Sequence, residues 1–167
     1  MLRELGKLAF LQWHSPLETT RRAHSLLSIE TLEIPISLGF YYTAYSNDNL
    51  VGFGTYAFVS PDQIPKVLGK NREPMRHEDF HSGDDFWIVD IVAPFSKNSA
   101  LNVINVFRRD LPPAIKRMRA IRGSRAGNVR VLEYFRTGAE TWAPKYRTIE
   151  SILTEAKMET SNLQTHP

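Results

Sequence analysis

The sequence predicts an α+β fold in which helices flank a mostly antiparallel central sheet. Segments with helical spacing alternate with short apolar and aromatic segments, and turn residues join some of the short segments directly, as in hairpins. With 167 residues, 42% of them hydrophobic and 23% charged, the chain has the composition of one globular domain. We expect a single domain over residues 1–158 and a flexible tail over residues 159–167.

The first part of the chain predicts two helices and a hairpin. Apolar residues at helical spacing over residues 2–12 predict a short amphipathic helix. A second helix over residues 15–27 begins with Ser-Pro-Leu-Glu, in which Glu18 completes an S-x-x-E capping box. Residues 40–59 hold two β-prone segments around the turn Ser-Asn-Asp-Asn, which is typical of a hairpin.

The rest of the chain predicts elements from apolar periodicity and from the turn residues that flank it. In order, these are a short helix over residues 61–68, a polar loop over 69–83, a strand over 86–92, a helix over 98–109, strands over 117–122 and 129–135, and a last helix over 145–158. The two late strands lie on either side of a Gly-Ser-Arg-Ala-Gly turn.

Composition excludes several classes of site. The chain has no cysteine, so it contains no disulfide framework, no thiolate zinc site and no cysteine nucleophile. The first residues do not resemble a signal peptide, and no apolar run approaches the roughly 18 residues of a membrane span. We therefore expect a cytoplasmic protein without stable membrane insertion.

Basic residues concentrate in one part of the chain. Between Arg108 and Arg147 there are eleven Lys and Arg residues against three acidic ones, although the net charge of the whole chain is only +3. Such a basic block attracts an acidic partner, either nucleic acid, an anionic lipid surface or a small acidic carrier protein. A solvated face that keeps the protein soluble explains it equally well.

Asp90 is the first candidate for chemistry. It interrupts the apolar segment Trp87–Val92, and strand alternation gives this segment two apolar faces, which predicts a central strand. A carboxylate inside such a strand is costly to bury without a partner. Asp90 is therefore either a buried aspartate bonded to the backbone or to an arginine, or a carboxylate that acts as a base or orients one.

The histidines give weaker signals. His77 and His81 have the i, i+4 spacing of metal ligands on a helix, but the polar loop around them favours solvent exposure, and we expect no metal site. His14 and His24 have the positions of ordinary packed or exposed histidines. The sequence contains no nucleophile elbow and no phosphate-binding P-loop.

Residues 82–95, with the sequence SGDDFWIVDIVAPF, carry a family resemblance. They are similar to the S-G-D-x-x-W-x-I-D-W-I-A-P-F signature of the toxin-activating lysine acyltransferases, the haemolysin-C-like proteins. Supporting similarities cover about 150 residues with few gaps. They lie in the early L-G…W…S-P-L segment, in residues 51–57, in Arg-Ala-Ile-Arg at 119–122 and in residues 130–134.

This resemblance implies a fold and an activity. The family resembles the GNAT-like acetyltransferases in fold and is typically dimeric. It moves a fatty acyl group from acyl carrier protein to internal lysines of a protoxin. Acyl-acyl carrier protein is then the donor, no cofactor or metal is bound permanently, and the partners are the carrier protein, a protoxin-like acceptor and a second copy of the chain. Nucleic acid is not expected as a partner. We further expect a pre-formed apolar groove beside the strand that contains Gly52 and Gly54 to hold the acyl chain.

Two family residues are expected to be catalytic, a histidine directly after S-P-[LM] and the aspartate of the signature. Asp90 matches the aspartate, but Glu18 occupies the histidine position. Glu18 replaces the histidine as a base if burial raises its pKa. Alternatively, His24 or His14 has taken over that role. In a third interpretation catalysis is altered or lost, and the protein binds the carrier protein or a secreted partner without turnover.

Overall fold

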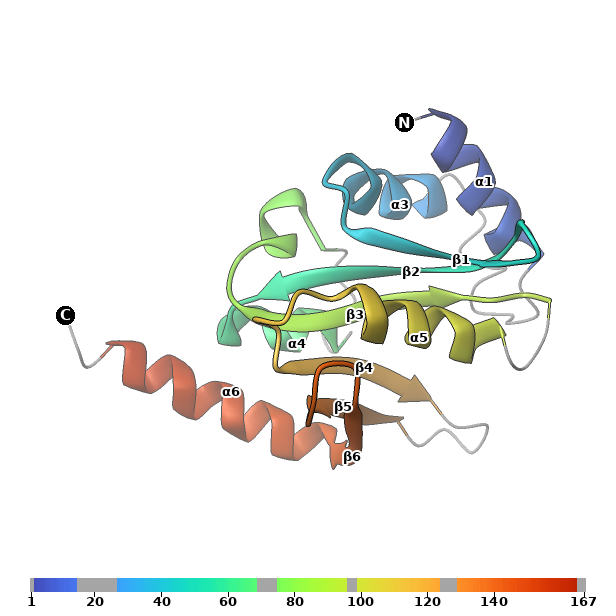
Figure 1. The fold of residues 1–167 in the computed structure, drawn as a ribbon. Helices are drawn as coiled ribbons and strands as arrows, with labels where there is room; N and C mark the ends of the chain where they lie inside the picture. Colours follow the sequence, from blue (N-terminus) through green and yellow to red (C-terminus); the bar gives the residue numbers. More distant parts are fainter. Residues whose placement is uncertain (1, 15–26, 69–74, 96–98, 124–128, 165–167) are drawn as a thin grey trace. The chain divides into compact units, whose positions relative to one another are not determined.

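The computed structural model describes residues 2–14, 27–68, 75–95, 99–123 and 129–164. Figure 1 shows how its helices and strands follow one another along the chain. The helical elements are α1 (Leu2–Trp13), α3 (Leu27–Ser37), η1 (Pro61–Gln63), α4 (Ile64–Val67), η2 (His77–Phe80), α5 (Ser99–Asp110) and α6 (Ile149–Gln164). The strands are β1 (Tyr41–Ser46), β2 (Asn49–Val59), β3 (Asp85–Val92), β4 (Arg117–Gly123), β5 (Val129–Arg136) and β6 (Trp142–Thr148).

The strands in the described ranges form a six-stranded sheet whose order follows the sequence from β1 to β6. The pairs β1–β2, β4–β5 and β5–β6 are antiparallel, whereas β3 and β4 are parallel. A parallel pair needs a crossover connection, and α5 supplies it between β3 and β4. The predicted α+β fold with a mostly antiparallel sheet is confirmed, and β3 is an internal strand, as its two apolar faces indicated.

Packing divides the chain into two compact units, which we describe separately. Unit 1 comprises Met1–Tyr56 and Asp90–Leu111, and unit 2 comprises Ala57–Val89 and Pro112–Pro167. Most of β2 and the last residues of β3 therefore belong to unit 1, together with α1, α3 and α5. The start of β3, the strands β4–β6 and α6 belong to unit 2. No helix in the described ranges is both long and apolar enough to cross a membrane.

The hairpin β1–β2 in unit 1 turns at Asn47 and Asp48. Both residues have positive φ angles, 49° and 62°, which Asn and Asp tolerate better than most other residues. The side-chain amide of Asn49 donates a hydrogen bond to the Asn47 carbonyl at 3.1 Å and holds the turn. The predicted hairpin and its polar turn are confirmed.

The core of unit 1 lies between α1, α3, β2 and the end of β3. α1 contributes an apolar stripe, as predicted, and its Leu8 and Leu11 are almost completely buried. Each buried leucine contributes about 1.5–3 kcal/mol of hydrophobic free energy. The buried members of this core are Leu8, Leu11, Leu32, Ile36, Phe53 and Val92.

The core of unit 2 forms between the start of β3, the strands β4–β6 and α6. α6 packs against β5 and β6, and Figure 1 shows it beside them. Ile152 and Ala156, one turn apart on α6, are both buried, as an amphipathic helix on a sheet requires. Other fully buried side chains of this unit are Phe86, Trp87, Ile88 and Met118.

Three elements differ from the sequence prediction. The short helix η2 lies within the predicted polar loop over residues 69–83. α3 was not predicted, yet it runs from Leu27 to Ser37 and holds Pro35 in its last turn. The predicted helix over residues 145–158 was wrong at its start. β6 occupies residues 142–148 instead, and pairing of all seven residues with β5 outweighs the weak local signal.

Two further expectations concern the ends of elements. The predicted second helix over residues 15–27 lies, except for Leu27, outside the described residues. α6 continues to Gln164, beyond the predicted end of the last helix at residue 158. The other predicted strands and helices are confirmed to within a few residues, including the short helix over residues 61–68, which η1 and α4 form.

Candidate functional site

The segment 82–95 begins with a turn that is tied to the end of β2. The Ser60 amide donates a hydrogen bond to Ser82 Oγ at 3.1 Å, and the Ser82 hydroxyl donates to the Asp79 carbonyl at 3.1 Å. The Gly83 amide donates to the Phe58 carbonyl at 3.2 Å. These bonds fix the entry into β3.

Gly83 is required by sterics. A Cβ atom built on it would lie 2.5 Å from the Ser60 amide nitrogen and 2.7 Å from the carbonyl carbon of Val59. Both are backbone atoms and cannot move aside as a flexible side chain would. The glycine of the signature therefore permits close contact between two backbone segments.

Asp85 accepts hydrogen bonds from two arginines and a tryptophan. Trp87 Nε1 donates to its Oδ2 at 2.7 Å, and Arg117 Nη2 donates to its Oδ1 at 3.0 Å. Arg119 Nη1 donates to Oδ2 at 2.5 Å, and its guanidinium lies 5.5 Å from the centre of the buried Trp87 ring. The aspartate and tryptophan at the start of β3 thus form a structural cluster.

Arg119 is the centre of a larger ion-pair network. It is 1% exposed and also donates to Glu133, which is fully buried, and to Glu155 of α6. Arg147 of β6 donates to both of these glutamates. Three arginines thus face three carboxylates, Asp85, Glu133 and Glu155, so the formal charges of the cluster cancel.

The ion-pair network shifts the pKa values of Arg119 and Glu155. Burial alone would lower the pKa of Arg119, but the carboxylates of Asp85, Glu155 and Glu133 outweigh it and raise that pKa. Desolvation likewise opposes ionisation of Glu155, yet hydrogen bonds from Arg119 and Arg147 lower its pKa overall. The network therefore favours the charged forms of Arg119 and Glu155.

The network also changes the interpretation of the basic block. Arg117, Arg119 and Arg147 are neutralised inside it, and Arg109 pairs with Asp110. Arg136 donates to three backbone carbonyls and stacks on a tryptophan ring. Among the described side chains of the block, those that are exposed and without an ion pair are Lys116, Arg130 and Lys145.

Asp90 lies in the second half of β3 and belongs to unit 1. Its side chain keeps some exposed surface, yet its carboxyl group is desolvated strongly enough to raise its pKa. The hydrogen bond from the Ile91 amide opposes this rise and does not cancel it. No basic side chain in the described ranges forms an ion pair with it. Asp90 is thus a carboxyl group that holds its proton more strongly than an ordinary aspartate.

Of the three residues considered as partners of Asp90, the structure describes His14. It is exposed and directly follows α1 in unit 1. Its Nδ1 lies 2.8 Å from the Phe10 carbonyl, and because a carbonyl only accepts, Nδ1 carries the hydrogen. In the neutral ring Nε2 is then a free acceptor. Glu18 and His24 lie outside the described residues.

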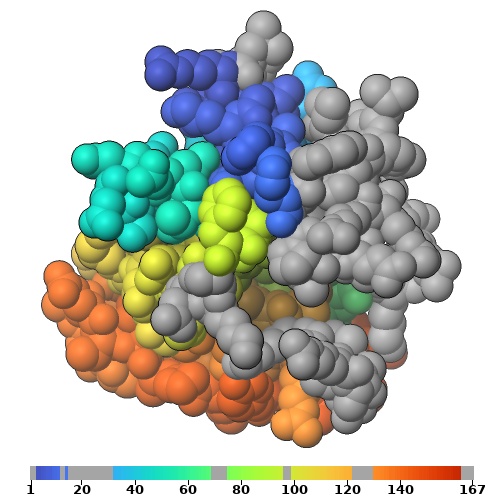
Figure 2. Space-filling view, turned by 90° about the vertical axis from the view of Figure 1, so that its right-hand side faces the viewer, coloured from blue at the N-terminus to red at the C-terminus, as the bar shows by residue number. Residues whose placement is uncertain are grey.

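His14 lies near the end of the signature segment. Its ring centroid is 4.2 Å from that of Phe10 and 6.4 Å from that of Phe95. Phe10 and Phe95 are both more than half exposed. Figure 2 shows the end of α1 in blue beside the yellow-green residues that follow β3. This part of unit 1 therefore presents an imidazole between two exposed aromatic rings.

The space directly over Gly52 and Gly54 on one side of β2 is filled. A Cβ atom on Gly52 would lie 2.8 Å from a methyl carbon of Val103, and one on Gly54 would lie 2.5 Å from the Phe107 ring. Val103 and Phe107 belong to α5, which therefore fills the space over both glycines. The two glycines allow α5 to pack closely on β2, and an acyl groove elsewhere beside this strand stays a prediction.

His77 and His81 lie on and directly after η2. Their ring centroids are 5.5 Å apart and nearly perpendicular, and both residues are exposed. No group of three or more side chains suited to bind a metal occurs in the described ranges. The pair is a surface contact.

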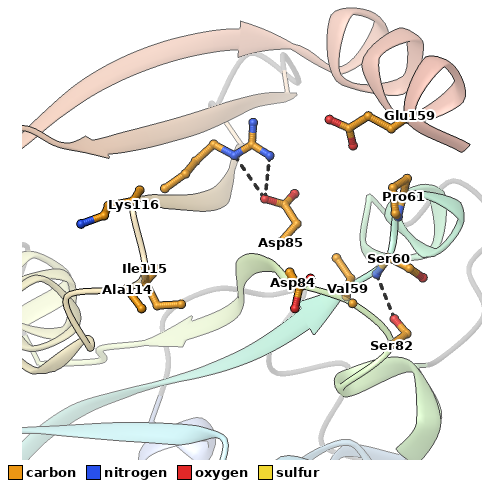
Figure 3. A pocket seen from close by; sticks show the side chains of 12 residues that line it. Val59, Ser60, Pro61, Ser82, Asp84, Asp85, Ala114, Ile115, Lys116 and Glu159 are labelled. Atoms are coloured by element: carbon orange, nitrogen blue, oxygen red, sulfur yellow. Dashed lines mark hydrogen bonds and ion pairs between the residues drawn. The ribbon is translucent and has the colours of Figure 1, made fainter. Parts of the chain in front are cut away.

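A pocket of about 520 Å³ in unit 2 was not found from the sequence. Figure 3 shows it between the end of β2, the signature turn, the start of β4 and α6. Its walls combine Val59, Pro61 and Ile115 with the carboxylates of Asp84 and Glu159. No sequence signal could reveal it, because these residues come from four separate segments.

The comparisons with known proteins agree with the resemblance of the signature. The model of the RTX toxin acyltransferase family matches residues 1–135. The protein-lysine palmitoyltransferase CyaC of Bordetella bronchiseptica is 31% identical over 137 residues, which cover 78% of this chain and 68% of that protein. CyaC of Bordetella parapertussis matches to the same extent. The chain therefore belongs to the RTX toxin acyltransferase family and is an acyltransferase.

Proposed function

We propose that this protein transfers a fatty acyl group from acyl carrier protein to the side-chain amine of internal lysines in a protoxin-like acceptor. The observation that carries the proposal is the family match together with Asp90 at the aspartate position of the signature. The relatives named as protein-lysine palmitoyltransferases support lysine as the acceptor group.

The proposed reaction exchanges a thioester for an amide. The neutral lysine Nζ attacks the thioester carbonyl carbon, the new C–N bond forms, and the C–S bond breaks. The carrier thiolate leaves and takes up a proton, while the nitrogen loses one. A lysine ammonium has no lone pair for this attack, and its ordinary pKa is about 10.4, so a base must remove a proton first.

Asp90 supplies this base or positions it. A carboxyl group whose pKa is raised by desolvation accepts a proton more readily than an ordinary aspartate. His14 is a suitable second group, because its Nδ1–H is held by the Phe10 carbonyl and its Nε2 can accept a proton. Glu18 and His24 remain alternative bases. In each case the base activates the lysine nitrogen and does not attack the thioester itself.

The test is acyl transfer from palmitoyl-acyl carrier protein to a lysine-containing acceptor, read as the mass of the acceptor. Wild type should form an acyl-lysine adduct, and Asp90→Asn should lower the rate by about 100-fold or more, the usual contribution of a positioned acid or base. Asp48→Asn is the matched control, since Asp48 is exposed in the hairpin turn and asparagine tolerates its positive φ angle. Absence of the adduct, or undiminished activity of Asp90→Asn, excludes the proposal.

The base is identified by three single variants. His14→Ala, Glu18→Gln and His24→Ala are compared in the same assay, and the variant of the true base loses activity to the extent of Asp90→Asn. The rate of that variant should also lose the rising limb of its pH profile. Three variants that all stay at the wild-type rate would show that Asp90 acts alone.

A second candidate function is binding of the carrier protein or a secreted partner without turnover. It is favoured by Glu18 in place of the family histidine. Tight binding of palmitoyl-acyl carrier protein without adduct formation would support it. If Glu18→His then raises the adduct yield, the fold still supports the chemistry and only the base has been lost.

The family resemblance also leads us to propose a homodimer. Light scattering on the purified protein should give a mass of twice the 19.1 kDa of the chain. A mass that stays monomeric at all concentrations tested would exclude a stable dimer.

A further inference from the structure

The pocket of unit 2 has the size of a ligand site. Its volume of about 520 Å³ falls within the roughly 300–1,000 Å³ that is usual for such sites. It borders the signature turn and the start of β4, and Glu159 of α6 closes one side (Figure 3). Neither the proposed chemistry nor Asp90 uses this pocket.

The carboxylates that line the pocket differ in whether they form ion pairs. Asp85 is neutralised by Arg117 and Arg119. Asp84 and Glu159, by contrast, form no ion pair with any side chain in the described ranges. Figure 3 shows the Glu159 carboxylate directed toward Asp85, and both Asp84 and Glu159 line the pocket. Two carboxylates without an ion pair therefore line one cavity.

The cations of the pocket do not balance these charges. Arg117 is engaged with Asp85 and with Glu155. Lys116 lines the pocket as well, but its side chain extends away from the two carboxylates in Figure 3 and is exposed. A bound anion would have to approach both Asp84 and Glu159, whereas a cation is attracted by both.

The remaining wall is apolar. Val59 at the end of β2, Pro61 of η1 and Ile115 before β4 line the same cavity. A ligand that fits these walls has an aliphatic part and a cationic end. Lysine and arginine side chains have this build, because they place their methylene stems on apolar surface and their charge among polar groups.

We propose that this pocket binds a lysine or arginine side chain of the acceptor polypeptide, with the cation between Asp84 and Glu159 and the aliphatic stem on Val59, Pro61 and Ile115. This inference rests on the proposed function for the identity of the partner. The bound side chain is not the one that is acylated. It anchors the acceptor, so the pocket raises the affinity for the acceptor and leaves the chemical step unchanged.

The direct test is binding of a small probe. N-acetyl-arginine amide and N-acetyl-norleucine amide, an uncharged control, are titrated into the ¹⁵N-labelled full chain at low salt. The arginine probe should give saturable shifts at the amides of Gly83 and Lys116, which line the pocket. The norleucine probe should bind at least about tenfold more weakly. No saturable shifts, or equal binding of both probes, would overturn the proposal.

Variants test whether the arginine probe binds at Asp84 and Glu159. The double variant Asp84→Asn/Glu159→Gln should weaken the arginine probe by about tenfold or more, whereas Glu140→Gln, an exposed carboxylate away from the pocket, should leave it unchanged. Lys116→Gln should strengthen binding by about twofold, because it removes the remaining free cation among the described lining residues. Weaker binding to Lys116→Gln, or full binding to the double variant, would contradict the assignment.

A kinetic test separates this inference from the proposed function. With an acceptor peptide that carries one acylable lysine and one arginine, the double variant should raise the acceptor KM by about tenfold and keep kcat. Replacing the peptide arginine by norleucine should raise the KM of wild type in the same way. If wild type transfers no acyl group at all, the proposed function fails, while the probe titration still decides whether the pocket binds a cation.

Discussion

At the scale of single residues, Asp90 makes the stability of the fold depend on pH. Desolvation raises its pKa, so the folded protein holds this proton more strongly than the unfolded chain does. Ionisation of Asp90 therefore lowers the free energy of unfolding as pH rises from the ordinary aspartate range through the raised pKa. Below the ordinary range the carboxyl group is protonated in both states, and no penalty exists.

Asp90→Asn should remove this penalty. We expect the variant to melt at a higher temperature than wild type at pH 7.5, because it has no carboxyl group whose ionisation is opposed by desolvation. The difference should vanish near pH 3.5, where wild type is protonated as well. Thermal unfolding followed by circular dichroism at both pH values measures it. A variant that is less stable at pH 7.5 would show that Asp90 is a structural carboxylate.

Replacing glycine by alanine should destabilise the fold at Gly83 and stabilise it at Gly6. Gly83→Ala places a methyl group against the Ser60 backbone and should cost about 1–3 kcal/mol of unfolding free energy, or more. Gly6 lies inside α1, and no atom lies within 4 Å of the position that a Cβ atom would take there, so Gly6→Ala should stabilise by about 0.5–1 kcal/mol. Urea unfolding of both variants gives the two values, and equal effects would refute the steric role of Gly83.

At the scale of elements, the ion-pair network joins α6 to β3, β4, β5 and β6. Glu133 is fully buried and accepts from Arg119 and Arg147. Glu133→Gln removes one of three carboxylates that face three arginines, so the buried network is left with a net positive charge, and the change should cost about 3–5 kcal/mol. Glu4→Gln, which breaks the partly exposed pair with Lys7, should cost less than about 1 kcal/mol. Denaturant unfolding compares them, and similar costs would mean that the network contributes little.

The same network makes the fold sensitive to acid. Hydrogen bonds from its arginines outweigh desolvation and lower the pKa of Glu155, so its stabilisation is present above the ordinary glutamate range. It is lost as pH falls through the lowered pKa. The unfolding free energy of wild type should therefore decrease between about pH 5 and pH 3 more steeply than that of Glu155→Gln. Identical slopes in an acid titration would contradict this linkage.

The sequence predicted most elements because their signals are local. The hairpin turn at Asn47 and Asp48 and the apolar stripe of α1 are examples. β6 was missed because Pro144 and its charged neighbours do not suggest a strand. Its register with β5 is a tertiary property, and as the last strand in the order it tolerates a proline.

The candidate site was predicted only in part, and for a physical reason. A signature identifies residues that a fold needs as well as residues that react. Ser82, Gly83, Asp85 and Trp87 hold the entry of β3, whereas Asp90 has the raised pKa that is common at functional sites. The pocket beside Asp84 combines separate segments, so no pattern along the chain could predict it.

At the scale of the whole molecule, the structure shows that only part of the basic block can attract a partner. Much of its charge is engaged in internal ion pairs, and Arg130 on β5 and Lys145 on β6 are among the residues left free to attract a partner. Attraction of an acidic carrier protein by such residues is long-range and acts mainly on the encounter. Nucleic acid would need a continuous basic surface, which neutralisation of the arginines reduces.

Charge-reversal variants distinguish a local effect of these residues from an effect of the protein's net charge. Lys145→Glu should raise the KM for palmitoyl-acyl carrier protein by about five- to tenfold at low salt without changing kcat. Lys157→Glu, an exposed lysine of α6 outside the basic block, changes the net charge equally and should have little effect. Because the Debye length falls to about 3 Å at 1 M salt, the two variants should converge with wild type as salt rises. Equal effects of both variants at low salt would show that the carrier protein responds to the net charge alone and not to Lys145 in particular.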